Sequence, residues 1–252
     1  MAPRFRSLAA NLTTLLALAA LWHTVALLIA RPVVPPPTAV LVALLQETPR
    51  TLGRHVAASL WRVIAGIGFS IATAAPLGLA LGQSRRLNRL LAPLVYLLYP
   101  VPKVVLVPII LLVLGVGEVP KIVIIALILF FQILVLVRDA ASSIRPELLT
   151  SVRSLGAGRR ALFRFVYMPA TLPAVLTAIR QSIGTAIAVL YIAELFATQY
   201  GLGYYIYVQG STLFNYPRMY AGIVAMSLLG FGLVAVVDFL ERRLCPWRHR
   251  AA

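Results

Sequence analysis

The chain has 252 residues, of which 61% are hydrophobic and only 12% are charged, a composition that excludes an ordinary soluble domain. A formal net charge of +16 would suggest nucleic-acid binding in a soluble protein. In a membrane protein the same basic residues set orientation instead, so we expect contact with membrane lipid and no nucleic-acid partner.

Apolar runs long enough, or nearly long enough, to cross about 30 Å of hydrocarbon occur six times. They cover residues 12–30, 56–81, 90–114, 122–137, 175–197 and 219–240. The first run resembles a signal peptide because Arg4 and Arg6 precede it, but its length indicates an uncleaved span. We therefore predict an all-α integral membrane protein in which residues 1–252 form a single transmembrane domain.

The segment between the first two runs contains Pro32 and Pro35 to Pro37, which favour stiff, extended backbone. Residues 38–45 then predict a separate short helix lying at the outer membrane surface. In the second run, Gly78 and Gly82 are four residues apart, a spacing that permits close packing against another helix.

The third run is interrupted by prolines, each of which removes a backbone donor and bends or breaks a helix. They are Pro93, Pro100, Pro102 and Pro108. Broken backbone at membrane depth is tolerated inside protein or beside a water-filled cavity. This run is therefore predicted to line the interior of the protein rather than face lipid.

The loop at residues 145–173 is the least membrane-like stretch. Pro146 suits the first position of a helix, Glu147 suits its positive end, and Gly156 can supply the left-handed residue that closes it. Leu148, Val152 and Leu155 fall on one face of this short helix. A helix of this length is not stable alone, so it needs a surface or partner to lie on.

The same loop resembles the EAA loop of permease subunits in ATP-binding-cassette importers: Glu-Ala-Ala, three residues, Gly, nine residues, Ile, one residue, Leu-Pro. Thr150 to Val152 stand for Glu-Ala-Ala, Gly156 for the glycine, Val166 for the isoleucine, and Met168-Pro169 for Leu-Pro. Thr150 departs from the pattern by replacing the acid. The chain as a whole is similar to the nitrate/sulfonate/taurine-type permeases.

The resemblance implies a type I importer permease fold in which a cytoplasmic coupling helix docks an ATPase. Its expected coupling residues are Glu147, Leu148, Thr150, Ser151, Val152, Arg153, Leu155, Gly156 and Pro169. It also implies a permease homodimer, two ATPase subunits that bind ATP and Mg²⁺, and a periplasmic or lipid-anchored binding protein. The implied solute is small and often anionic, such as nitrate, a sulfonate, taurine or bicarbonate.

Two ionisable residues are candidates for the transport pathway. Lys103 lies within the broken third run, and Glu194 lies near the end of the fifth. A charge at this depth is costly unless it is paired or hydrated. Lys103 is therefore either a structural partner of Glu194 or a positive point that attracts an anionic solute, and Glu194 either holds a helix end or contacts the ligand.

Charge distribution sets the expected topology. With a cytoplasmic N-terminus, 16 of the 23 Lys and Arg residues fall on the cytoplasmic side, six on the opposite side, and Lys103 within a span. Arg62 is counted among the six. Both termini and the 145–173 loop are therefore expected in the cytoplasm, with the chain in the bacterial inner membrane.

The sequence lacks the motifs of an enzyme. Neither lysine lies in a phosphate-binding Gly-x-x-x-x-Gly-Lys loop, and neither His-Glu-x-x-His nor Gly-x-Ser-x-Gly occurs. We expect no cofactor or metal in this chain and no catalysis by it alone. Two alternatives to an import permease stay open: an ion-coupled secondary carrier, which needs paired or relayed intramembrane charges, and a membrane scaffold that transports nothing.

Overall fold

The computed structural model describes residues 2–196 and 198–249, and its regular structure there is entirely helical. The first half contains α1 (Ala2–Ile29), α2 (Pro37–Glu47), η1 (Thr48–Leu52), α3 (Gly53–Gln83), α4 (Arg85–Leu98), η2 (Lys103–Leu106), α5 (Val107–Leu114) and α6 (Glu118–Ser142). The second half contains α7 (Pro146–Ser154), α8 (Arg159–Leu162), η3 (Phe163–Tyr167), α9 (Met168–Leu195), α10 (Leu202–Tyr207), η4 (Val208–Thr212), α11 (Tyr216–Leu244) and α12 (Pro246–His249).

Five helical segments of the described chain are long and apolar enough to cross a membrane, and a bent pair makes a sixth if it counts as one span. The helices extend past the predicted apolar runs. The run at 122–137, for example, lies inside α6, whose ends carry Glu118 and Asp139. Hydropathy marks only the part of a helix in hydrocarbon, and helices continue into the polar interface. The predicted end of the fifth run, residue 197, lies outside the described residues.

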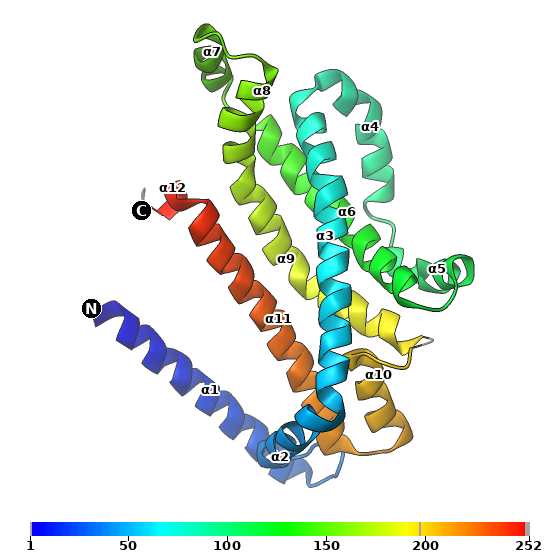
Figure 1. Ribbon diagram of the computed structural model, residues 1–252. Coiled ribbons are helices and arrows are strands. Elements are labelled where there is room, and N and C mark those ends of the chain that lie inside the picture. Colours follow the sequence, from blue (N-terminus) through cyan, green and yellow to red (C-terminus); the bar gives the residue numbers. More distant parts are fainter. Residues whose placement is uncertain (1, 197, 250–252) are drawn as a thin grey trace.

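The short helix predicted at 38–45 is not separate from the second span. It is α2, and it continues through the π-helical turn η1 into α3 as one helical stretch, residues 37–83. Pro37 and Pro49 each lie in the first turn of their element, where a missing backbone donor costs no helical bond. The chain therefore bends here without leaving helical geometry (Figure 1).

The predicted break in the third span is confirmed. The segments Arg85–Leu98 and Lys103–Leu114 are bent by 77° relative to each other. Pro100 and Pro102 fall between them, where each removes a donor and disfavours helical backbone in the residue before it. Three leucines on this bent pair are largely exposed: Leu90 at 74%, Leu97 at 72% and Leu112 at 85%.

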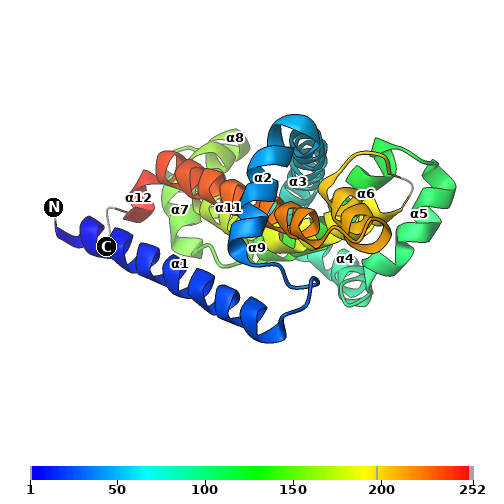
Figure 2. The same cartoon turned by 90° about the horizontal axis from the view of Figure 1, so that it is seen from below.

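The core is formed by α3, α6 and α9. On α6, Ile124, Ile125, Leu129 and Ile133 are almost completely buried. The close packing predicted for Gly78 is present, because a Cβ at that position would lie 2.8 Å from the Leu134 carbonyl oxygen. Figures 1 and 2 show α1 on one side of this layer and the α4–α5 pair on the other.

The first helix, α1, lies largely apart from this core (Figure 2). Its attachment is near its C-terminal end, where Trp22 stacks on Tyr220 of α11 with ring centroids 5.8 Å apart and Ala26 is buried. Figure 1 shows α1 running towards the end of the bundle that holds α2 and α10, and α11 running away from it. Both termini therefore lie away from the end that holds α2 and α10, and α7 and α8 lie on the same side as the termini (Figure 1).

Candidate functional site

The short helix α7 has the ends predicted for it. Arg145 is extended, Pro146 occupies the first helical position, and Glu147 lies in the first turn. Gly156 adopts φ +81°, and its amide donates to the Arg153 carbonyl oxygen at 2.9 Å. A side chain with a Cβ is disfavoured in this left-handed conformation, so the glycine ends the helix and turns the chain towards α8.

Together with α8, helix α7 projects beyond the rest of the bundle (Figure 1). The side chains of Leu148 and Leu155 are 53% and 85% exposed, and Val152 is half-buried. Leu155 lies one residue past the helix end. Exposed leucines at the tip of a projection, followed by Arg159 and Arg160, form a surface that has an unpartnered apolar centre and a basic edge.

The other predicted coupling residues divide into two groups. Glu147, Ser151 and Arg153 are exposed on α7, and the Thr150 hydroxyl donates to the Pro146 carbonyl oxygen at 3.1 Å within the same helix. Pro169 lies apart from them, in the first turn of α9 beyond α8 and η3. Their role in coupling stays a prediction.

At the opposite end of the bundle, Glu194 is fully buried and accepts several hydrogen bonds. Its carboxylate accepts from the Ser59 hydroxyl at 2.8 Å, from the Gly203 amide at 2.8 Å, and from Arg62 Nη1 at 2.6 Å. A carboxylate satisfied by donors from α3 and α10 can remain charged inside protein. Glu194 therefore holds the end of α9 and the start of α10.

Arg62 is the centre of this charged group. Its side chain is 2% exposed and forms a two-bond fork with Glu118 of α6, at 2.6 Å from Nε and 2.5 Å from Nη2. Its Nη1 also donates to the Tyr200 carbonyl oxygen at 2.7 Å. One guanidinium thus connects α3, the start of α6 and the loop after α9. Gly201 is required beside it, because a Cβ there would lie 2.5 Å or less from the Glu194 carboxylate.

The sequence placed Arg62 among the charges on the side opposite the cytoplasm and gave it no partner, and the structure shows that its side chain is buried against two carboxylates. The residue lies inside the second span, one turn beyond the buried Ser59. The available signal was its place within the predicted run 56–81, since a charge there requires a partner. Its partners could not be identified from sequence because they lie 56 and 132 residues away.

The end of the bundle that holds α2 and α10 is also rich in aromatic side chains. Tyr205 of α10 is buried, and its ring lies 5.2 Å from the His55 imidazole. Burial and the nearby Glu47 carboxylate raise the pKa of Tyr205 to about 12, so the phenol is neutral at physiological pH. His55 Nδ1 lies 3.0 Å from the Gly201 amide nitrogen and 2.9 Å from the Gly201 carbonyl oxygen, and adds a second attachment for the loop after α9.

Lys103 is not paired with Glu194. Its ammonium donates to the carbonyl oxygens of Leu98, Tyr99 and Val101, at 2.6, 2.8 and 3.0 Å, and lies 4.4 Å from the Phe131 ring centroid. It therefore satisfies carbonyls that the end of α4 leaves without helical partners. A cavity of about 260 Å³ adjoins it, lined in part by Tyr99, Phe131 and Gln132.

In the part of the chain that the structure describes, no carboxylate lies within 4.0 Å of the Lys103 ammonium, and no group of three His, Cys, Asp or Glu side chains could hold a metal ion. The structure thus brings Glu194 together with Arg62 and Glu118, and leaves Lys103 with backbone and aromatic partners.

Comparison with known proteins assigns the family. Residues 66–245 match the family described as binding-protein-dependent transport system inner membrane component. The taurine transport system permease protein TauC of Escherichia coli is 32% identical, over 97% of this chain and 92% of the relative. A putative aliphatic sulfonates transport permease protein, SsuC of Bacillus subtilis, is 28% identical, over 77% of this chain and 70% of the relative.

A solved structure supports the fold. A chain of the inward-facing MetNI methionine ABC transporter superposes with a TM-score of 0.68 at 21% identity, covering 77% of this chain and 95% of that one. This likeness shows the arrangement of a type I importer permease. By its family match and its relatives, the chain belongs to the binding-protein-dependent transport system inner membrane components and is a permease subunit of an ABC importer.

Proposed function

We propose that this permease moves a small anionic solute of the sulfonate class inward, as a homodimer bound to two ATPase subunits and served by an external binding protein. The observation that carries the proposal is the projecting α7 surface, with Leu155 85% exposed beside basic residues and outside the spanning helices. A solvent-facing apolar tip of this kind fits a groove on a partner protein. The relatives named for taurine and sulfonates suggest the solute class.

The proposal also assigns the remaining surfaces. The bent α4–α5 pair exposes Leu90, Leu97 and Leu112, and in the proposed homodimer the second copy covers this apolar side. The interior predicted for the broken span would then form between the copies. The α7 end and both termini face the cytoplasm, and the Arg62 end faces the binding protein.

Reconstitution tests the function. The permease is purified from its host membrane, co-purifying chains are identified, and the complex is placed in liposomes with the binding protein. We expect ATP-dependent accumulation of taurine or an alkyl sulfonate, and less of an uncharged analogue of equal size. Uptake driven by an ion gradient without ATP would establish the secondary carrier instead. A purified complex without an ATPase chain, and without uptake under either condition, would establish the scaffold.

A further inference from the structure

The cavity beside Lys103 lies where the break in the third span meets α6. Its volume is about 260 Å³, many times the space that one water needs. The break contributes residues 99 and 101–104 to its lining, and α6 contributes Ile128, Phe131 and Gln132. Broken backbone at membrane depth is tolerated beside such a cavity, so this position agrees with the interior predicted for the third span.

Gln132 brings a polar side chain to this cavity. Within the apolar run 122–137 it is the only residue that has one. Its amide oxygen accepts from the Ser182 hydroxyl of α9 at 3.2 Å, and Ser182 is 1% exposed. That bond alone joins the two side chains across α6 and α9. Among the described residues the amide nitrogen of Gln132 has no acceptor, so its N–H donors are available to a solute in the cavity.

The acceptors beside the cavity are already used. The carbonyl oxygens of Tyr99 and Val101 accept from the Lys103 ammonium, and the amide oxygen of Gln132 accepts from Ser182. No carboxylate is among the described residues that line the cavity. A ligand that enters therefore meets free donors and a positive charge, and a ligand that needs acceptors finds none free among these groups.

This chemistry selects an oxyanion over a cation. The Lys103 protons are directed at three carbonyl oxygens, but the ammonium keeps its charge, and that charge acts over several ångströms in a medium of low dielectric constant. Basic side chains select anions in membrane pathways in the same way. The direct hydrogen bond to the anion then comes from the Gln132 amide.

We propose that this cavity is a transit site for the oxyanion group of the solute, in which the Gln132 amide donates to a sulfonate oxygen. Ser182 is a positioning residue, because its hydroxyl holds the amide oxygen and leaves the amide nitrogen for the solute. Lys103 contributes charge and not a hydrogen bond. The inference rests on the proposed import of an anionic solute, and it adds the residue that recognises the anion.

Charge-selective labelling tests the site without measuring transport. In a Cys245→Ser background, Ile128→Cys places a thiol in the cavity, one turn of α6 from Gln132. The complete complex, hydrolysing ATP in liposomes, is treated with a sulfonate-bearing or a trimethylammonium-bearing methanethiosulfonate. Relative to their rates with a thiol in solution, we expect the sulfonate reagent to react faster by about tenfold or more. Ethanesulfonate should slow this reaction, and ethylammonium should not.

Gln132→Glu separates recognition of the anion from helix packing. The carboxylate still accepts from Ser182, but the free donors are replaced by a negative charge. The preference for the sulfonate reagent should fall by about tenfold or more. Gln132→Leu, which removes the donors without adding a charge, should also lower the preference and serves if Gln132→Glu does not fold.

A matched control is available on α9. Gln181 is adjacent to Ser182 but is exposed and does not line the cavity, so Gln181→Glu adds the same charge and should leave the preference unchanged. An unchanged preference in the Gln132 variants, or no reaction of either reagent, would overturn the proposal. Selective labelling without ATP-dependent sulfonate uptake would remove the proposed function and keep the site. Uptake with unselective labelling would remove only the site.

Discussion

At the scale of single residues, the largest departure from expectation is that a buried arginine organises the α10 end of the molecule. Arg62 carries one positive charge among the two carboxylates of Glu118 and Glu194, and the nearby Lys121 is also 2% exposed. The four formal charges balance. Buried charges of this kind are tolerated when geometry and hydrogen bonding are complete, and removing one partner leaves another uncompensated.

Arg62→Met should therefore destabilise the permease by about 3–5 kcal/mol, because Glu194 would remain buried without its cation. Thermal unfolding in lipid nanodiscs measures this. Adding Glu194→Gln should restore part of the loss, since a neutral amide needs no counter-charge. Arg54→Met, on the same helix but exposed, is the control and should change stability little. An unfolding temperature for Arg62→Met equal to that of the control would contradict the structural role.

Lys103→Met should destabilise the fold by about 0.5–1.5 kcal/mol, because three carbonyl oxygens at the end of α4 lose their donor. Glu194→Gln should not rescue it, because the two side chains are not paired. Stability and anion uptake are measured on the same preparation. Normal stability with reduced uptake would instead place the Lys103 charge on the solute pathway.

At the scale of elements, α7 depends on its ends and not on packing. No residue of α7 is buried, and its stop is provided by Gly156 at φ +81°. A short helix without buried contacts is marginal in isolation. Its persistence is therefore linked to a partner surface, and substitutions there should affect assembly more than folding of the membrane helices.

Leu155→Asp should weaken ATPase association by about tenfold or more while the membrane fold survives, because it places a charge at the exposed apolar tip. Co-purification measures the association with the ATPase, and thermal unfolding measures the stability of the membrane fold. Ser154→Asp, adjacent and already polar, is the matched control.

Gly156→Val should also impair assembly, through strain on the order of 1–2 kcal/mol in the left-handed turn. Thr150→Glu should be tolerated. Full ATPase association by both Leu155→Asp and Gly156→Val would remove α7 from the coupling site.

At the scale of the whole molecule, the two ends of the bundle differ in charge and in construction. The α7 end carries exposed arginines on α4, α7 and α8, among them Arg85, Arg153 and Arg159. The other end is formed by α2, α10 and the loop held by Arg62. Basic residues are retained on the cytoplasmic side of a membrane, so the molecule's charge asymmetry supports a single orientation.

Cysteine labelling checks that orientation. In a Cys245→Ser background, Ala157→Cys near α7 should react with a membrane-impermeant maleimide only in inside-out vesicles. Val116→Cys, in the turn between α5 and α6, should react only in intact cells. Labelling of Ala157→Cys from the outside of intact cells would reverse the topology and place α7 on the wrong side for an ATPase.

The sequence by itself determined the features that depend on neighbouring residues. Apolar length marked the spans, Pro100 and Pro102 marked the break, and Pro146 with Gly156 marked both ends of α7. Each follows from local rules: the thickness of hydrocarbon, a missing backbone donor, and the freedom of glycine at positive φ. These features needed no knowledge of what packs against them.

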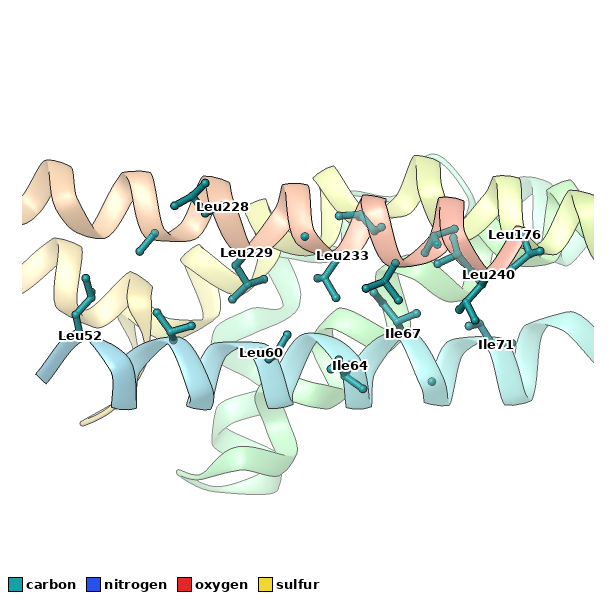
Figure 3. A pocket seen from close by; sticks show the side chains of 18 of the residues that line it. Leu52, Leu60, Ile64, Ile67, Ile71, Leu176, Leu228, Leu229, Leu233 and Leu240 are labelled. Carbon is teal, nitrogen blue, oxygen red and sulfur yellow. The ribbon is translucent and has the colours of Figure 1, made fainter. Parts of the chain in front are cut away.

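Only the tertiary structure decided which charges meet and which surfaces stay open. Glu194 pairs with Arg62 because α3 and α9 both pack on α6, and Lys103 binds carbonyls that the 77° bend turns towards it. An apolar groove lined by α3, α9 and α11 lies beside Gly68, between helices about 160 residues apart in the sequence (Figure 3). Local pattern fixes helices, whereas the free energy of a buried charge or an unfilled space depends on partners that the fold brings together.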